Sequence, residues 1–260
     1  QMLEKKISFD KALKDAQEKG FAELDPYDDI SGTDTAYKLL ILSNLVFGTK
    51  EKITSVYKEG IEGIESIDLE MAEKLGYSVT LLGITNIKKK FIQFRVHPCL
   101  VPKNSIIAKV KNELNTVIIE ADMSDKTVII GKGAGKKPTA SAVVSDILNI
   151  NKPKYRILNN RVKFDSFKKI NMKERKGKFY IRMEVLDSPG VLADITAYFK
   201  KEKISISSMF QLERDKSDYV QLIFVTHNVI ERQLILVVKK IEKIDKVKTK
   251  AKFIRIENNL

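Results

Sequence analysis

An acidic loop that leads directly into an apolar helix constrains the fold of this chain more than any other stretch. Five carboxylates lie between Glu23 and Asp34, and Lys38 follows Asp34 by one helical turn. Positions 33–47 are apolar nearly all round, which predicts a helix that is buried on every side. Residues four apart share one face of a helix, so the side chains of Asp34 and Lys38 should project together beside the loop. The stretch therefore predicts a buried helix with a charged pair at its start.

Two interpretations of this acidic loop remain open. Carboxylates held close together repel each other unless a cation or a substrate ammonium lies among them. A lysine beside carboxylates can give up or take a proton during a reaction. The loop therefore favours a pocket for a small amine-bearing molecule. The alternative is a capped acidic loop with a solvent-exposed ion pair and no ligand.

The order of these residues resembles the catalytic signature of homoserine dehydrogenases. Residues 16–39 read Ala-Gln-x-x-Gly-Phe-Ala-Glu-x-Asp-Pro-x-x-Asp-Ile-x-Gly-x-Asp-x-Ala-x-Lys-Leu. The resemblance implies that Lys38, with Asp34 beside it, transfers the proton in catalysis. It also implies that Glu23 binds the amino group of homoserine, and that Asp29 and Asp34 line the same pocket.

The family resemblance implies an activity that needs a nicotinamide cofactor. Homoserine dehydrogenases interconvert L-aspartate 4-semialdehyde and L-homoserine with NAD(P), in threonine and methionine biosynthesis. One departure is visible, because Phe21 stands where the family usually has Tyr, which removes a hydroxyl near the substrate. In the family, the nucleotide-binding unit precedes this region, together with a second active-site lysine and a monovalent-cation site.

The sequence contains no strand, glycine turn and helix of the usual nucleotide-binding kind. We therefore expect NAD(P) to be bound mainly by a domain outside this sequence, and we expect the chain alone to be inactive. The chain begins with Gln1, which we interpret as an N-terminal truncation.

Size and composition indicate a soluble chain of two domains. The chain has 260 residues, of which 43% are hydrophobic, and this is enough to fill two cores. It contains no run of 18 apolar residues and no secretion signal. Its single cysteine, Cys99, excludes an internal disulfide and fits a reducing compartment. We therefore expect a cytoplasmic protein with no membrane partner.

The net charge of +13 is concentrated in one segment. Residues 151–178 hold 11 Lys and Arg against Asp165 and Glu174, a net charge of +9. The segment has no strong hydrophobic period and contains Pro153, so we predict a basic linker. Its aromatic residues could stack on bases, but no nucleic-acid motif surrounds them, and we expect no nucleic-acid partner.

Alternating apolar residues predict a sheet after the first helices, with one hairpin over residues 77–96 and another over 116–130. Between them lie His97 and Cys99. Two ligands are too few for zinc, so we predict no metal site and interpret the pair as a buried cysteine and a hydrogen-bonded histidine. Homoserine dehydrogenases have a similar Val-His-Pro element at this place.

Glycines at alternate positions precede a predicted helix after the second hairpin. Their backbone can approach a phosphate or carboxamide closely, but the spacing fits neither the dinucleotide fingerprint nor the P-loop. A tight turn without a ligand is the alternative. The string Gly-x-Gly-Ala-Gly-x-x-Pro-Thr-Ala-Ser-Ala-Val, from Gly131, is similar to a second signature of the family. The resemblance implies that Gly133, Ala134 and Gly135 lie near the nicotinamide end of the cofactor.

The C-terminal part has a clean alternation of elements. From residue 179 the pattern predicts strand, helix, strand, strand, helix and strand, an α+β unit of ferredoxin-like order with helices on one face. We expect the second helix to begin at Asn228, with Glu231 three residues later completing a capping box.

The first of these strands ends in Asp-Ser-Pro-Gly-Val-Leu, which resembles the ACT domain, a regulatory module that binds amino acids. The resemblance implies an effector site at Asp187, Gly190 and Leu192, in which Asp187 takes the ammonium and the helix start takes the carboxylate. A plain ferredoxin-like turn without a ligand is the alternative. ACT modules usually bind at interfaces between copies, which implies a homodimer or homotetramer.

The predicted fold class is α+β, with a mixed sheet covered by helices followed by a βαββαβ ferredoxin-like ACT domain. We assign residues 1–150 to a catalytic domain for substrate binding and dimerisation, 151–178 to the basic linker and 179–260 to the ACT regulatory domain. We predict a homoserine dehydrogenase with amino-acid feedback, for which threonine is the expected effector. The competing hypothesis is a non-catalytic amino-acid sensor with a dimerisation platform.

Overall fold

The computed structural model describes residues 2–5, 7–20, 22–111, 113–150, 167–212 and 218–258. The N-terminal part, residues 2–150, contains α1 (Met2–Lys5), α2 (Phe9–Glu18), α3 (Tyr27–Ile30), α4 (Thr33–Phe47), η1 (Ile53–Ser55), β1 (Val56–Lys58), α5 (Ser66–Lys74), β2 (Tyr77–Lys88), β3 (Phe91–Pro102), α6 (Ile106–Lys109), β4 (Leu114–Ala121), β5 (Asp125–Lys132) and α7 (Lys136–Ile150). The C-terminal part, residues 167–258, contains β6 (Lys168–Lys169), η2 (Met172–Glu174), β7 (Lys176–Leu186), α9 (Val191–Lys201), β8 (Ile206–Gln211), β9 (Tyr219–Thr226), β10 (Val229–Ile230), α10 (Glu231–Ile241) and β11 (Lys252–Ile256). None of the described helices is long and apolar enough to cross a membrane.

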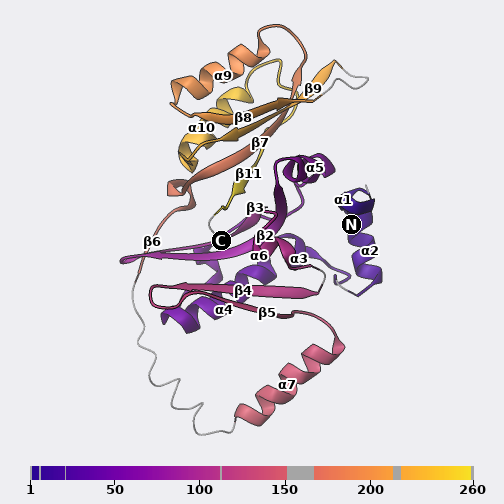
Figure 1. Cartoon of the computed structure of the whole chain (residues 1–260), viewed down its shortest axis with the longest axis vertical. Coiled ribbons are helices and arrows are strands. Elements are labelled where there is room, and N and C mark those ends of the chain that lie inside the picture. The colour runs from indigo at the N-terminus through magenta and orange to yellow at the C-terminus, as the bar shows by residue number, and fades with distance from the viewer. Residues whose placement is uncertain are drawn as a thin grey trace.

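One mixed sheet joins the two parts of the chain. Its strand order among the described residues is β1-β3-β11-β7-β9-β8, with β2, β6 and β10 attached beside this path. Strand β3 pairs antiparallel with β2 along its whole length, while its other edge pairs in parallel with β6, β1 and β11 in turn. Because β11 also pairs with β7, the sheet continues from the N-terminal part into the C-terminal part (Figure 1).

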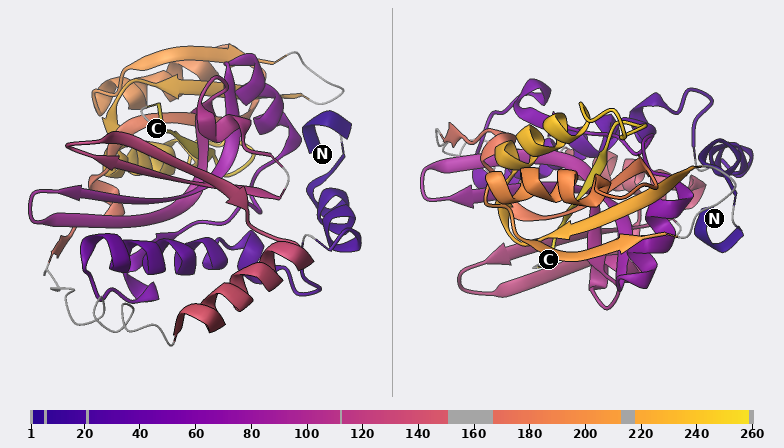
Figure 2. Two further views of the ribbon diagram at one scale, coloured as in Figure 1. Left: turned by 60° about the horizontal axis from the view of Figure 1, so that its bottom comes forward. Right: turned by 90° about the horizontal axis from the view of Figure 1, so that it is seen from above.

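Helix α4 lies against one face of the β2–β3 pair (Figure 2). Ala36 and Leu40 on its inner face pack against buried apolar residues of β3. The prediction that this helix is buried on every side is wrong, because Ile41 and Leu45 on its outer face are 61% and 69% exposed. An apolar helix surface indicates that something covers it, but the pattern does not say that the same chain supplies the cover.

The two predicted hairpins are confirmed as β2–β3 and β4–β5, and β4 and β5 form a separate two-stranded sheet. Helix α7 follows them and lies at the lower end of the view in Figure 1. Nearly all of its side chains are exposed, including the apolar Val144, Ile147 and Leu148.

The C-terminal part confirms the predicted βαββαβ order and the α+β fold class. Its strands lie in the order β11-β7-β9-β8, and each neighbouring pair is antiparallel. Helices α9 and α10 cover one face, where Ile195 and Leu234 are completely buried. The opposite face is also covered, because Met71 and Ala72 of α5 pack against Tyr180 and its neighbours in the sheet. The two parts therefore share a hydrophobic core.

The predicted capping box at Asn228 is wrong. Helix α10 begins one residue after its N-cap Ile230, which makes no side-chain cap bond. Glu231 is instead buried and accepts two hydrogen bonds from Arg255 on β11. A buried arginine competes for the carboxylate more strongly than a backbone N–H, because hydrogen bonds between two charged groups are the stronger kind.

The predicted linker is only partly visible. Residues 151–166 and the departure at Phe21 lie outside the described residues. Residues 168–178 form β6, η2 and the first residues of β7, and Met172 and Arg175 are buried there. The domain limits at 150 and 178 stay a prediction.

Candidate functional site

The structure brings Asp34 and Lys38 together at the start of α4. The Lys38 ammonium lies 2.6 Å from the Asp34 carboxylate, as the spacing predicted, and both side chains are about half exposed. An exposed pair of this kind contributes at most about 1 kcal/mol to stability. The pair is therefore dispensable for folding and accessible to a small molecule.

The loop before this pair is held in place by buried contacts. Ile30 is buried, and its carbonyl accepts a hydrogen bond of 2.9 Å from the backbone N–H of Ile61. Gly32 has a φ of 76°, a left-handed conformation that favours glycine, and a Cβ there would meet the Val96 side chain at 2.9 Å. The Lys58 ammonium donates to the Thr33 hydroxyl at 2.8 Å. These contacts fix where α4 begins.

Lys58 and Gly60 were missed by the sequence analysis. A Cβ on Gly60 would lie 2.4 Å from the Ile30 carbonyl oxygen, so only glycine fits against the loop. Both residues lie more than twenty positions from the loop in the chain, and no periodic signal indicated the contact.

Glu23 and Asp29 lie in the same acidic stretch but are not bonded to the lysine. Both are exposed, and within the described ranges no hydrogen bond or ion pair links either carboxylate to Lys38. The Glu23 backbone carbonyl accepts from Gln17 at 2.9 Å, which ties the loop to α2. The acidic residues thus form an open surface in the chain by itself, and their roles as substrate ligands stay a prediction.

The glycine-rich turn joins β5 to α7 on the surface. Gly133, Ala134 and Gly135 are exposed, and Gly135 has a φ of 120°. The Gly133 N–H donates to the Glu113 carbonyl at 2.8 Å, which anchors the turn at the end of the hairpin. The Asn115 side chain lies against Gly133, so the backbone that stays open ahead of α7 is at Gly135, where a Cβ would meet only Pro138, at 3.5 Å.

His97 and Cys99 are completely buried, as predicted for a structural pair. The thiol lies 3.1 Å from the His97 Nδ1. Burial raises the pKa of the Cys99 thiol, and burial with the positive field of Arg255 holds the pKa of His97 well below 6.5. A neutral imidazole and a neutral thiol are the result.

Glu257 brings a third potential metal ligand to this pair. The ligand atoms of His97, Cys99 and Glu257 lie within 4.8 Å of one another. The Glu257 carboxylate already accepts from Arg95 at 3.3 Å and from Arg175 at 2.8 Å. A divalent cation would have to replace two guanidinium groups, so the cluster is suited to balancing the arginines and not to binding a metal.

A small pocket of about 40 Å³ lies at the end of β7, where the ACT signature was recognised. Asp187 and Leu192 line it together with Gln211, whose side-chain amide donates to the Asp187 carboxylate at 3.3 Å. The Ser188 hydroxyl is buried and has no hydrogen-bond partner among the described residues. Gly190 adopts a φ of 91° as the N-cap of α9. An acidic group and a free hydroxyl therefore converge at a helix start.

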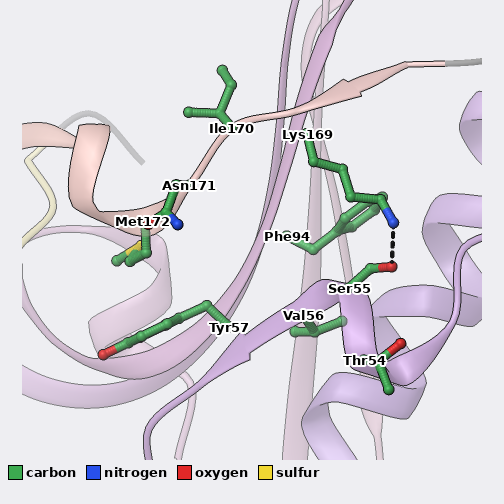
Figure 3. Close-up of a pocket in the computed structure, with 9 residues that line it drawn as sticks. All are labelled: Thr54, Ser55, Val56, Tyr57, Phe94, Lys169, Ile170, Asn171 and Met172. Carbon is green, nitrogen blue, oxygen red and sulfur yellow. Dashed lines mark hydrogen bonds between the residues drawn. The ribbon is translucent and has the colours of Figure 1, made fainter.

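A second and larger pocket of about 410 Å³ lies between β1 and the segment that follows β6 (Figure 3). The Lys169 ammonium at its rim donates to the Ser55 hydroxyl at 2.8 Å and lies 2.8 Å from the Glu51 carboxylate. Phe94 lies behind them, and the Tyr57 hydroxyl points away from Lys169. Because the lysine is already paired, the pocket offers no free charge to a ligand.

Two family models match the chain. The homoserine dehydrogenase model matches residues 1–148 and the ACT domain model matches residues 179–246. The homoserine dehydrogenase of Helicobacter pylori is 37% identical over 99% of this chain, and that of Neisseria gonorrhoeae is 36% identical over 99%. The chain spans 61% of the length of each of these relatives. The crystal structure of a homoserine dehydrogenase from Thiobacillus denitrificans is 37% identical in sequence and superposes with a TM-score of 0.88. The superposed region covers 99% of this chain and 60% of the Thiobacillus chain.

Proposed function

The chain belongs to the homoserine dehydrogenase family and carries an ACT domain, and from this premise we propose that it supplies the substrate site of an NAD(P)-dependent enzyme. The reaction is the interconversion of L-homoserine and L-aspartate 4-semialdehyde in threonine and methionine biosynthesis, in the cytoplasm. The observation that carries this proposal is the accessible Asp34–Lys38 pair at the start of α4, within the family signature.

Lys38 moves the proton of the reaction. When homoserine is oxidised, its O–H proton passes to the Lys38 amine, and in the reverse direction the Lys38 ammonium returns a proton to the new hydroxyl. Asp34, at 2.6 Å, holds the amine in place and balances its charge. A fixed amine within hydrogen-bond reach of the hydroxyl contributes roughly 10²- to 10⁴-fold to the rate.

Glu23 binds the substrate ammonium, and Asp29 lines the same pocket together with Asp34. The Glu23 and Asp29 carboxylates are exposed, carry no ion pair within the described ranges and lie on the loop that leads to Asp34. Repulsion among these carboxylates is relieved when the ammonium lies between them. The substrate is thereby placed with its hydroxyl towards α4.

The turn at Gly133, Ala134 and Gly135 fits the carboxamide end of NAD(P). Glycine lets the backbone approach a flat ring, and the exposed turn leaves room for it. NAD(P), when bound, supplies the hydride acceptor or donor. The rest of the cofactor requires a nucleotide-binding domain, which these residues do not provide, so we propose that the chain alone does not turn over.

A second copy of the chain covers the outer face of α4. Tyr37, Ile41 and Leu45 present a continuous apolar surface on this helix. Monomeric proteins rarely leave such a surface in water. We therefore propose a homodimer or homotetramer.

The pocket at Asp187 binds an amino-acid effector, with threonine as the expected one. Asp187 takes the ammonium, the unpartnered Ser188 hydroxyl takes a polar side chain, and the start of α9 beyond Gly190 takes the carboxylate. The pocket of about 40 Å³ holds little more than a water. The effector therefore needs β7 and α9 to part, or a wall from a second copy.

The test is Lys38→Ala in the protein that contains this chain and its nucleotide-binding domain. Turnover should fall by roughly 10²- to 10⁴-fold, while the free energy of unfolding changes by less than about 1 kcal/mol, since the side chain is half exposed. Lys14→Ala, an exposed lysine on α2, is the matched control and should keep full activity. Normal turnover in Lys38→Ala would remove the catalytic assignment.

Calorimetric titration separates this function from the amino-acid sensor. Homoserine binding that is lost in Glu23→Gln supports the enzyme, whereas threonine binding without homoserine binding supports the sensor.

A further inference from the structure

Arg255 is a buried cation that connects the C-terminal part to the N-terminal part. It lies on β11, is 0% exposed and donates two hydrogen bonds, of 3.0 and 2.6 Å, to the Glu231 carboxylate at the start of α10. It also donates to the Glu59 carboxylate at 2.6 Å and to the Tyr57 hydroxyl at 3.0 Å. The Tyr57 hydroxyl in turn donates to Glu59 at 3.0 Å. We call Tyr57, Glu59, Glu231 and Arg255 the Arg255 cluster.

The Glu59 end of this cluster lies against the acidic stretch that precedes α4. The Glu59 N–H donates to the Val96 carbonyl at 2.9 Å, which holds the segment on β3. The next two residues contact the loop directly, because Gly60 packs on the Ile30 carbonyl and the Ile61 N–H donates to it. A shift of Glu59 must therefore move Ile30, which lies two residues before the left-handed Gly32 and four before Asp34.

The Glu231 end of the cluster lies on the helical layer that contains the effector pocket. Glu231 is the first residue of α10, and α10 packs against α9 through a common core that includes Ile195 and Leu234. The N-terminal residues of α9, Val191 and Leu192, line the pocket at Asp187. Glu231 lies at the start of β7, where its N–H donates to the Arg175 carbonyl, whereas the pocket lies at the other end of that strand. A ligand that parts α9 from the sheet would therefore reach the Glu231 carboxylate by shifting α10 as one body.

Displacement of one residue of the Arg255 cluster moves the others, because Arg255 cannot give up either of its acidic partners. An arginine removed from water is stable only while its acidic partners stay bonded to it, and loss of either partner leaves an uncompensated buried charge. Burial raises the pKa of the Tyr57 hydroxyl to about 12, so this group remains a hydrogen-bond donor to Glu59. Movement of Glu231 is thus followed by Arg255 and Glu59 together.

We propose that the Arg255 cluster is the link through which occupancy of the ACT pocket changes the position of α3 and the start of α4, which carry Asp29 and Asp34. Glu59 and Arg255 are positioning residues, since neither touches the proposed substrate. This inference rests on the proposed function, in which the ACT pocket binds an amino acid and the loop binds homoserine.

A second cluster, around the buried Arg182, provides the control, although its Glu65 side chain is 62% exposed. Arg182 on β7 donates to Asp68 at 2.7 Å and to Glu65 at 2.6 Å, and the Tyr180 hydroxyl donates to Asp68 at 3.0 Å. This cluster also joins the C-terminal sheet to the N-terminal part and has the same composition of arginine, tyrosine and two acids. Its acids lie at the N-cap and in the first turn of α5, however, and make no contact of this kind with residues 30–34 within the described part of the chain.

The experiment compares Tyr57→Phe and Glu59→Gln with Tyr180→Phe and Glu65→Gln in the full chain. Calorimetry measures the Kd of homoserine with and without saturating threonine. Threonine should change this Kd by at least about fivefold in the unaltered chain and in both controls, as is usual for coupled sites. In the two Arg255-cluster variants the change should fall below about twofold while homoserine still binds. Equal coupling in all four variants overturns the proposal.

A second experiment needs no ligand, so it tests the proposal even if neither amino acid binds. Failure of both homoserine and threonine to bind would refute the proposed function. Hydrogen exchange is followed at the Ser31 and Ile61 amides, which are bonded to the Tyr27 and Ile30 carbonyls. Glu231→Gln, at the far end of the cluster, should speed exchange at both amides by about tenfold, whereas Glu65→Gln should leave them unchanged. Unchanged exchange in Glu231→Gln overturns the link, and Tyr57→Phe supplies a milder variant should Glu231→Gln fail to fold.

Discussion

Replacing Gly32 with alanine should destabilise the chain at the point where the acidic loop enters α4. The backbone of Gly32 has a φ of 76°, in the left-handed region, where a side chain costs roughly 1–2 kcal/mol. The added Cβ would also lie 2.9 Å from the Val96 Cγ1 on the completely buried middle of β3. Forcing an extra methyl into such a core typically costs about 1–3 kcal/mol. The expected loss for Gly32→Ala is therefore about 2–5 kcal/mol.

Gly76→Ala separates the two contributions. Gly76 has a φ of 81°, almost the same conformation, but a Cβ there would meet no atom within 4 Å. This variant carries the backbone strain without the clash, so we expect a loss of only about 1–2 kcal/mol.

Urea unfolding, followed by circular dichroism, gives the free energy of unfolding of the two variants and of the unaltered chain. The m-value should stay constant, because the surface exposed on unfolding is unchanged. The reasoning is refuted if Gly32→Ala and Gly76→Ala lose the same free energy, since the contact with Val96 would then have no effect. A loss confined to Gly32→Ala would refute the strain argument instead.

Two further predictions concern the buried pair on β3. The pKa of His97 is held well below 6.5 in the folded chain, so the unfolded chain takes up the proton first as the pH falls. The contribution of His97 to the free energy of unfolding should therefore be constant above about pH 6.5. Below that pH, the free energy of unfolding should fall by about 1.4 kcal/mol per pH unit. His97→Gln should remove this part of the acid dependence, whereas substitution of the exposed His227 should preserve it, and identical acid profiles for the two variants would contradict the assignment. Burial raises the pKa of Cys99, so Ellman's reagent should react with it only at the rate of unfolding, and a fast reaction of the native chain at pH 8 would show that the thiol is accessible.

The sequence was sufficient for features that depend on neighbours in the chain. The alternation of apolar residues from Phe179 to Val185 marked a strand, and the four-residue spacing of Asp34 and Lys38 placed them side by side on α4. Burial of α4 was overestimated, because an apolar pattern on every side of a helix does not require the same chain to cover the outer face, where Ile41 and Leu45 are exposed. The Asn228 cap was misplaced because a partner 24 residues away, Arg255, binds Glu231 more strongly than the local backbone does.

The Arg255 cluster illustrates what no local pattern can reveal. Its central hydrogen bond joins residues 196 positions apart, and neither Glu59 nor Arg255 belongs to a motif. Two buried arginines, each paired with two acids, also bear on how separable the ACT domain is. Without the N-terminal part, Arg255 would keep only Glu231, Arg182 would lose both of its acids, and the sheet face around Tyr180 would be exposed to water. An unpaired buried charge and an uncovered apolar face each destabilise by several kcal/mol. The C-terminal part is therefore joined to the N-terminal part by the same interactions that hold it folded, which is the condition under which binding to one part can change binding to the other.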